Sequence, residues 1–312
     1  MKTFDAVHEL FLNYACPAKC SFCYNPPITP ELLRRELSFE QAAASLFSAA
    51  KDGADRLNLH GGEVTLRDDL PKILRLARKL GFKQITVVTN GVRLGDAPYA
   101  RTLKAAGVTH VRLSIHAPDA AGHDPILQIP GAFDRALAAL GHLRKLKVPV
   151  GLNFVLHRAN FKLLPAFVEH FCVREGIRDV IVYFPHLKGM MEINAAEAGV
   201  SYSEVIPFVR KSFGLLNRAG LQDCLLLANF TPCLLPEFIE RMLDWAGDAM
   251  APQEQVHPEG FTEDIHEMKG DQRAPVAACK ECSLRASCLG VEIEYRKRRG
   301  EAEFKALESQ AA

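Results

Sequence analysis

The fold is decided by the segment from residue 6 to residue 25, AVHELFLNYACPAKCSFCYN. Residues 6–14 form a short apolar run of the kind that becomes a buried strand in a parallel sheet. Cys16, Cys20 and Cys23 follow this run directly. Thiolates are the ligands of iron–sulfur centres, and a loop carrying three of them can wrap one face of a cluster. A tetrahedral zinc site needs a fourth ligand, and no Cys or His follows closely. Three thiolates on a four-iron cluster leave one iron open to a substrate or cofactor.

The first 220 residues alternate between short apolar runs and amphipathic stretches, which predicts βαβ units and a parallel sheet. In residues 68–80, for example, the apolar side chains fall on one helical face and Gly81 follows as a stop signal. Six strand–helix units favour a partial (β/α)6 barrel, in which chemistry is expected at the carboxyl ends of the strands. We expect strands at residues 6–14, 56–60, 84–89, 110–116, 149–156 and 179–184.

Composition indicates an ordinary folded protein and excludes several classes. The chain has 312 residues, 48% hydrophobic and 24% charged, enough for one large domain and a small one. A formal net charge of +1 gives no support for binding nucleic acid or an anionic membrane. The charged N-terminus is not typical of a secretory signal, and no apolar run approaches the roughly 18 residues of a membrane helix. We expect a cytoplasmic protein, whose nine cysteines are reduced and whose clustered cysteines bind metal or react.

The pattern changes after about residue 222. An acidic, glycine-containing stretch covers residues 253–272, and a late group of cysteines follows it. We therefore predict a core domain over residues 1–222 and a smaller, irregular domain over residues 223–312. This second part also contains several prolines, which interrupt regular secondary structure: Pro232, Pro236, Pro252, Pro258 and Pro275.

Motifs at the ends of the expected strands resemble those of the radical S-adenosylmethionine (radical SAM) enzymes. The CxxxCxxC spacing of the first cysteines, with Phe22 before the last, is that family's signature. The second strand ends in Gly61-Gly62-Glu63, which looks like its GGE motif, and the third ends in Thr89-Asn90-Gly91, similar to its TNG turn. Ser114 and Asn153 stand at the corresponding places of the fourth and fifth strands. The resemblance covers about residues 8 to 220.

The resemblance implies roles for these residues. Cys16, Cys20 and Cys23 would hold a catalytic [4Fe–4S] cluster whose open iron chelates the amine and carboxylate of SAM. The glycines let the backbone approach a ligand, Glu63 would hold the methionyl ammonium group, and Asn90 would belong to the same cofactor site. Phe22 would pack near the adenine. Ser114, Asn153 and Arg158 are candidates for the ribose or carboxylate, although polar residues at strand ends also bond ordinary loops. His60, His116 and His186 are interpreted as loop-bonding residues rather than bases.

The late cysteines form a second group. Cys279, Cys282 and Cys288 combine a CxxC pair with a third cysteine, and Cys233 is the nearest candidate for a fourth ligand. This group resembles the auxiliary-cluster extensions of radical SAM enzymes, and cysteine counting favours the short Twitch form, with one [4Fe–4S] cluster, over the longer SPASM form. A structural zinc knot, a three-cysteine cluster open to substrate, and Cys224 in place of Cys233 stay open as alternatives. Cys172 is predicted to be a buried packing residue.

The resemblance implies a radical SAM oxidoreductase or maturase. It would abstract hydrogen from a peptide, as in the maturation of ribosomally made peptides, or from a small metabolite, with net oxidation and with a flavodoxin or ferredoxin as reductant. Because the chain starts directly at the first strand, a separate peptide-recognition protein is expected. Two alternatives stay open: dehydrogenation of a sugar, cyclitol or nucleotide-like metabolite, and a non-catalytic iron–sulfur protein for electron transfer or sensing. A non-catalytic iron–sulfur protein would have no need of the Gly61-Gly62-Glu63 motif.

Overall fold

A computed structural model describes residues 7–243 and 253–308, and these residues contain a nine-stranded sheet in the order β7-β6-β5-β4-β3-β2-β1-β8-β9. Neighbouring strands are parallel except for the β8–β9 pair. All six predicted strands are present; Ala6, the predicted first residue of the first strand, lies outside the described residues. The strands are β1 Val7–Phe11, β2 Arg56–His60, β3 Gln84–Thr89, β4 His110–Ser114, β5 Val150–Val155, β6 Val180–Tyr183, β7 Leu225–Ala228, β8 Gln253–Val256 and β9 Thr262–Asp264.

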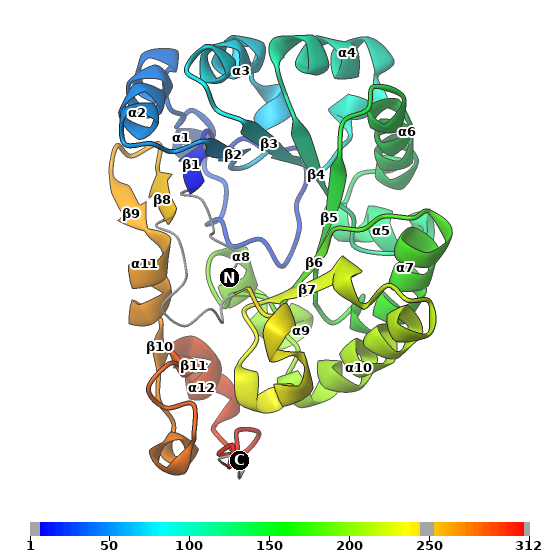
Figure 1. Ribbon diagram of the computed structural model, residues 1–312, viewed down its shortest axis with the longest axis vertical. Helices are drawn as coiled ribbons and strands as arrows, with labels where there is room; N and C mark the ends of the chain where they lie inside the picture. The colour runs from blue at the N-terminus through cyan, green and yellow to red at the C-terminus, as the bar shows by residue number, and fades with distance from the viewer. Residues whose placement is uncertain (1–6, 244–252, 309–312) are drawn as a thin grey trace.

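Helices cover the outer face of this curved sheet, which confirms the α/β partial barrel (Figure 1). The predicted helix over residues 68–80 is α3, and Asp69 stands at its N-cap position. The larger covering helices are α2 Phe39–Lys51, α3 Leu70–Lys79, α4 Ala97–Ala106, α5 Ala120–Leu127, α6 Ala132–Lys145, α7 Leu164–Val168 with its π-helical continuation Glu169–Arg174, and α10 Tyr202–Arg218. Shorter helices are α1 Pro30–Leu33, α8 Met190–Ile193, α9 Ala195–Ala198, α11 Ile265–Asp271 and α12 Ile293–Arg299.

The two faces of the sheet differ in polarity. Leu57 and Leu59 of β2 are fully buried in the hydrophobic core beneath the helices, whereas Asn58 between them is only partly buried. Side chains alternate across a strand, so Asn58 points to the concave face, and Arg112 and Asn153 do the same on β4 and β5. The barrel therefore has an apolar outer layer and a polar lumen, unlike a sheet buried in apolar surroundings on both faces.

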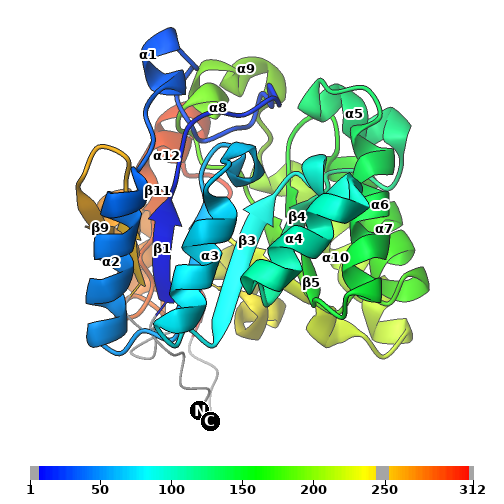
Figure 2. The ribbon, with the colours of Figure 1, turned by 90° about the horizontal axis from the view of Figure 1, so that it is seen from above.

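The carboxyl ends of the parallel strands meet at one edge of the barrel. Figure 2 shows strands β1 and β3 pointing to this edge, where the short helices α1, α8 and α9 lie. The cysteine loop that follows β1 is at the same edge, because the backbone N–H of Met191 in α8 donates to the carbonyl of Cys23. The fold thus brings the strand-end motifs together, as a parallel barrel requires.

The chain beyond residue 222 shares the sheet and the core with the rest. The predicted boundary falls just before β7, and β8 pairs in parallel with β1. Tyr295 and Phe304 belong to the main core cluster. A separate small sheet joins β10 Arg273–Ala274 to β11 Val291–Glu292. The second group of cysteines is therefore carried on a segment that packs against the barrel.

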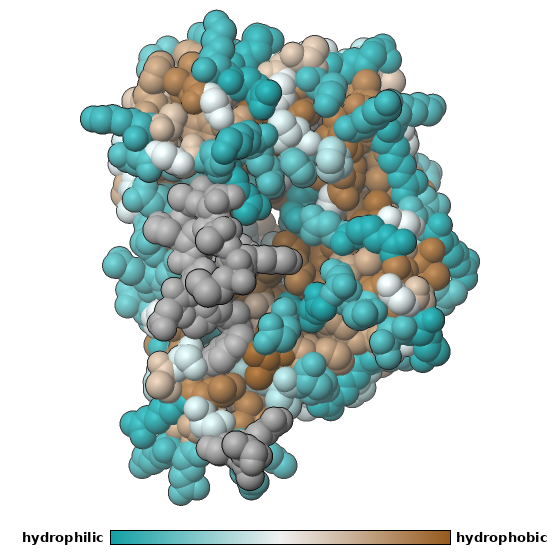
Figure 3. Space-filling model, in the orientation of Figure 1, coloured by the Kyte–Doolittle hydropathy of each residue, from teal (hydrophilic) through white to brown (hydrophobic). Residues whose placement is uncertain are grey.

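The molecular surface is mixed in polarity. On the face shown in Figure 3, hydrophilic residues cover most of the outer rim, with hydrophobic patches between them. Among the described residues, no helix is long and apolar enough to cross a membrane.

Candidate functional site

The first cysteine group lies in the loop that leaves β1. The thiols of Cys16, Cys20 and Cys23 are free and partly buried. Burial raises the pKa of Cys16 to about 12 and also raises the pKa values of Cys20 and Cys23. The charges of the other two thiolates raise the pKa of Cys20 further, so the three sulfurs are close neighbours. A bound cation would reverse this penalty, because coordination deprotonates a thiol.

Gly61 and Gly62 pack against the backbone that leads into the cysteine loop. A Cβ on Gly62 would lie well under 3.0 Å from the carbonyl oxygens of Tyr14 and Ala15. The Gly62 N–H donates to the Asn13 carbonyl at 2.6 Å, and the Glu63 N–H donates to the Ala15 carbonyl at 2.8 Å. The structure thus gives the glycines a second purpose besides approach to a ligand: they let two loops of the site touch.

Glu63 is buried and its carboxylate is already bonded by protein groups. Its Oε1 accepts from the Thr65 N–H, the Thr65 hydroxyl and the Thr89 hydroxyl, and its Oε2 accepts from the Asn90 N–H at 2.8 Å. Each carboxylate oxygen has two lone pairs, and Oε2 accepts only the Asn90 bond, so Oε2 keeps one position for a further donor. The charge of Glu63 also raises the pKa of Cys16, which shows that the carboxylate lies near the cysteine loop.

Two buried amides at the same edge have atoms without a hydrogen-bond partner among the described residues. They are Nδ2 of Asn90, a donor, and Oδ1 of Asn13, an acceptor. Asn13 Oδ1 lies beside Gly61, where an added Cβ would stand 3.1 Å from it. Buried amide groups of this kind normally find a partner, so both atoms suit a polar ligand. Asn90 was predicted from the sequence, whereas Asn13 was missed.

Phe22 packs between two histidines at the ends of β4 and β5. Its ring centroid lies 4.7 Å from that of His116 and 5.2 Å from that of His157. Sequence reasoning missed His157, although its position directly after a predicted strand was a signal. His116 acts as a loop-bonding residue, because its Nδ1 accepts from the Val155 N–H.

Ser114 and Asn153 lie opposite each other in the register of β4 and β5. The Asn153 amide oxygen is 3.5 Å from the Arg112 guanidinium, which pairs with Asp179 at 2.5 Å. Both predicted contacts therefore face the polar lumen near the carboxyl ends of their strands, as a ligand site at that edge requires.

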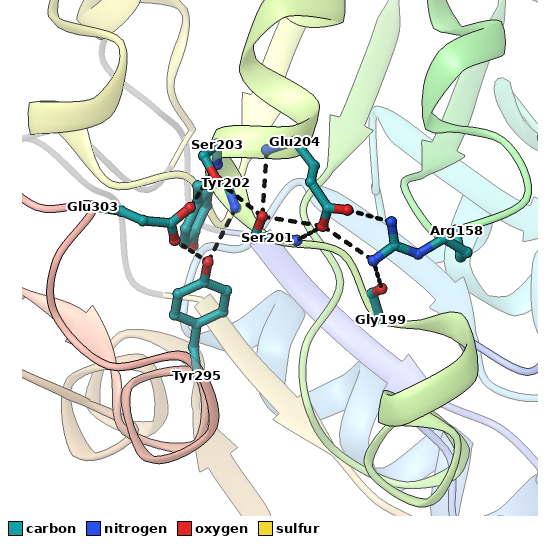
Figure 4. Close-up of polar contacts among 8 residues, drawn as sticks. All are labelled: Arg158, Gly199, Ser201, Tyr202, Ser203, Glu204, Tyr295 and Glu303. Atoms are coloured by element: carbon teal, nitrogen blue, oxygen red, sulfur yellow. Dashed lines mark hydrogen bonds and ion pairs between the residues drawn. The ribbon is translucent and has the colours of Figure 1, made fainter.

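Arg158 is bound to the start of α10 (Figure 4). Its guanidinium donates to both carboxylate oxygens of Glu204 and, at 2.9 Å, to the Gly199 carbonyl. The hydrogen bond from Arg158 is the main cause that lowers the pKa of Glu204 to about 2. Glu204 also closes the capping box of α10 with Ser201. These contacts support a role in fixing α10 rather than in holding the ribose or carboxylate of a cofactor.

His60 and His186 lie beside carboxylates, although the nitrogens that face these carboxylates make no hydrogen bond within the described residues. His60 Nε2 lies 3.3 Å from the carboxylate of Glu9 in the lumen, and His186 Nδ1 lies 3.5 Å from that of Glu292. Although burial raises the pKa of Glu9, the neighbouring His60 imidazole and hydrogen bonds from Asn58 and Gln253 hold it at about 2. Sequence reasoning missed Glu9, because nothing in the first strand shows that its carboxylate meets β2.

The second cysteine group surrounds one cavity. Cys233, Cys279, Cys282 and Cys288 all line it, together with Phe304. Backbone N–H groups donate to the sulfurs of the last three cysteines at 3.4, 3.5 and 3.4 Å. Among the described residues, no three His, Cys, Asp or Glu side chains stand as a single metal ion would need. Four thiols around one cavity could serve as ligands of an iron–sulfur cluster or of a structural zinc ion.

Cys224 lies away from this cavity. It is buried beside Cys172, whose pKa it affects, and its sulfur is 3.7 Å from the Arg178 guanidinium. Cys172 is fully buried in the main core, in agreement with a packing role. Of the two candidates for a fourth ligand, the structure therefore favours Cys233.

Comparisons with known proteins agree with this geometry. The model of the family described as the Radical SAM superfamily matches residues 11–166. The "PqqA peptide cyclase" of Xanthomonas campestris pv. campestris (strain B100) is 35% identical over 159 residues, which are 51% of this chain and 42% of that protein. The enzyme of the same name from Granulibacter bethesdensis is 33% identical over 159 residues, 51% of this chain and 41% of that one. The matches thus cover less than half of these relatives.

Solved structures share the fold across nearly the whole chain. Streptococcus suis SuiB bound to the precursor peptide SuiA covers 98% of this chain and 75% of its own, with a TM-score of 0.72 and 14% identity. Native anSMEcpe with bound AdoMet covers 96% of this chain and 92% of its own, with a TM-score of 0.67 and 14% identity. At such identities the likeness shows the fold alone. The family match over half of the chain, on the segment that carries the cysteine loop and Gly61-Gly62-Glu63, establishes that this protein belongs to the radical SAM superfamily.

Proposed function

We propose that this protein cleaves SAM reductively at a [4Fe–4S] cluster held by Cys16, Cys20 and Cys23, and that it oxidises a peptide. The observation that carries the proposal is the packing of the three-cysteine loop on Gly61-Gly62-Glu63 at the carboxyl edge of a radical SAM barrel. Membership of the superfamily implies both the cluster and SAM. When bound, they supply a 5′-deoxyadenosyl radical and methionine from SAM and one electron.

The residues at this edge fit both groups. Three neighbouring thiols provide the cluster ligands. For the amino-acid part of SAM, Asn13 Oδ1 and the remaining position on Glu63 Oε2 are acceptors, and Asn90 Nδ2 is a donor. The Glu63 carboxylate is fixed by four hydrogen bonds, so it would orient an ammonium group with little loss of side-chain freedom. The chain's own contribution is to hold the cofactor and exclude water from it.

Four cysteines around one cavity support a second cluster, which supplies a one-electron acceptor. The electrons would then balance as an oxidation. A reductant of the flavodoxin or ferredoxin class would supply one electron for the cleavage of SAM, and the substrate would give up one hydrogen atom to the deoxyadenosyl group and then one electron and one proton. One SAM is consumed for each product, and the product has lost two hydrogens.

A peptide is the preferred substrate because of the relatives. The curated relatives bear the name PqqA peptide cyclase, and a structure with the same fold was solved with its precursor peptide. A separate protein that presents the peptide is part of the proposal, and adding candidate proteins encoded beside the gene to the assay tests it.

The test uses protein reconstituted with iron and sulfide without oxygen, then mixed with SAM, a reductant and peptides encoded beside the gene. We expect 5′-deoxyadenosine and a peptide lighter by two hydrogens, about 2 Da, in equal amounts. The peptide assignment would be overturned if 5′-deoxyadenosine forms in every assay but no peptide changes mass. Polar metabolites would then be tested as substrates.

The Glu63→Gln variant tests the cofactor site. The substituted amide would lose the negative charge but keep the size of the side chain, so SAM affinity should fall while cluster absorbance stays intact. The matched control is Glu204→Gln, since Glu204 binds Arg158 at the start of α10. Equal SAM affinity of the wild type and the Glu63→Gln variant would remove Glu63 from the cofactor site.

A further inference from the structure

Three buried histidines form a group near the ends of β4 and β5, and two of them contact the cysteine loop through Phe22. His116 and His157 flank Phe22, and His123 of α5 stacks on His116 with 5.9 Å between ring centroids. The exposed fractions of His116, His123 and His157 are 3%, 0% and 3%. Phe22 stands between two of the cluster cysteines, so this group borders the cofactor edge of the barrel.

Backbone hydrogen bonds fix which ring nitrogen carries the proton. In each ring the Nδ1 atom accepts a hydrogen bond from a backbone N–H. His157 accepts from Ala159 at 3.3 Å, and His116 accepts from Val155 at 3.2 Å. His123 accepts from the backbone N–H of His116 at 3.1 Å. A neutral imidazole that accepts at Nδ1 carries its proton on Nε2. His157 therefore presents an Nε2–H donor.

This donor has no partner within the described part of the chain. His157 Nε2 is buried and unbonded, as is the Nε2 of His123. An unpaired buried donor is costly, and native proteins nearly always satisfy such groups with protein, water or ligand. His123 is separated from Phe22 by His116, whereas the His157 ring is tilted by only 33° against the Phe22 ring. Of the two unpaired donors, His157 is thus the one beside the cluster loop.

The imidazole of His157 is neutral, and this restricts the kind of ligand that it can bind. Burial lowers the pKa of His157 to about 4. A neutral donor beside a flat aromatic ring suits an uncharged, planar acceptor with lone pairs better than a carboxylate, which Arg or Lys would bind more strongly. The adenosine part of SAM has this chemistry, with ring nitrogens and ribose oxygens as acceptors.

We propose that His157 is a positioning residue whose Nε2–H donates a hydrogen bond to the adenosine part of SAM. The proposal rests on the proposed function, since it needs SAM at the Phe22 edge of the barrel. In this proposal the loop after β5 provides a polar contact that holds the nucleoside, while the amino-acid part of SAM is bound near Glu63.

Two substitutions separate this role from a structural one. In His157→Asn the amide lies near the former Nδ1 and can keep the Ala159 bond, but no donor reaches the Nε2 position. In His157→Gln the amide nitrogen lies near the former Nε2, so the donor is retained and the Ala159 bond is lost. Binding of SAM and of 5′-deoxyadenosine is measured on the reconstituted holoenzyme without reductant, so that no turnover occurs.

We expect His157→Asn to weaken the binding of both SAM and 5′-deoxyadenosine by about three- to tenfold, the effect of one neutral hydrogen bond, while methionine binding is unchanged. His157→Gln should bind SAM within about twofold of the wild type. The control is His170→Asn, because His170 packs on Phe171 in the π-helical segment.

The reverse order, with normal affinity in His157→Asn and weak affinity in His157→Gln, would show a purely structural histidine and overturn the proposal. Normal affinity in both variants would show that water satisfies the donor and would overturn it as well. In either case a wild type that cleaves SAM leaves the proposed function standing. A wild type with a full cluster that does not bind SAM would overturn the proposed function, and this proposal with it.

Discussion

The contact between the cysteine loop and Gly62 can be tested by adding a single methyl group. In Gly62→Ala the new Cβ would collide with the backbone carbonyls of Tyr14 and Ala15, which cannot rotate away as a flexible side chain would. Gly62 has no positive φ, so the effect is steric and not conformational. Relief requires the two loops to part, which would break the Gly62–Asn13 and Glu63–Ala15 hydrogen bonds of 2.6 and 2.8 Å.

Overpacking typically costs about 1–3 kcal/mol, and each lost backbone hydrogen bond about 0.5–1.5 kcal/mol. We therefore expect Gly62→Ala to lower the free energy of unfolding of the iron-free protein by about 2–6 kcal/mol and to reduce the iron bound after reconstitution. Urea denaturation and iron analysis measure the two effects. The control is Gly141→Ala in α6, where a Cβ meets nothing within 4 Å and should be neutral or stabilising by up to about 1 kcal/mol. Wild-type stability and iron content in Gly62→Ala would refute the assigned loop contact.

Three further predictions concern other parts of the molecule. Cys233→Ala should lower the iron content from about eight to about four per chain while Cys224→Ala leaves it unchanged, and the opposite result would exchange the two ligands. Arg158→Ala should leave SAM affinity within about twofold, because the Arg158 guanidinium binds Glu204 and the Gly199 carbonyl and not the cofactor site; a tenfold loss would return Arg158 to that site. The iron-free protein should lose stability as the pH falls from about 6.5 toward 4, since burial holds the folded pKa values of His123 and His157 at about 4 while the unfolded chain takes up protons near 6.5. Urea titrations of the wild type and of the His123→Asn, His157→Asn double variant at several pH values would check this dependence. A free energy of unfolding of the wild type that does not change with pH would contradict it.

Local patterns in the sequence were sufficient for much of the fold. The strands β2 and β3 have the predicted bounds, because short apolar runs between helical stretches define a parallel strand by themselves. The pairing of β8 with β1 was not predictable in this way, since it joins residues more than 240 positions apart and depends on tertiary packing. The same holds for β7, which extends the sheet beyond β6.

Site residues could be predicted where spacing carries the chemistry. The three-cysteine loop and Gly61-Gly62-Glu63 are contiguous motifs, so their meeting at one edge follows from parallel strands alone. The direction of a long side chain does not follow from spacing. Arg158 stands after the fifth strand as a ligand would, but its guanidinium turns to Glu204. His157 is one position before it, and its unpaired donor became visible only once burial and partners were known.

The role of the first three cysteines in holding the cluster that cleaves SAM is open to a direct test. 5′-Deoxyadenosine and methionine are measured after the reconstituted wild type and the Cys16→Ala, Cys20→Ala, Cys23→Ala triple variant are incubated with SAM and a strong reductant without oxygen. We predict equal amounts of both products from the wild type, none above background from the triple variant, and loss of one of two clusters in that variant. SAM cleavage by the triple variant at the wild-type rate would contradict this role.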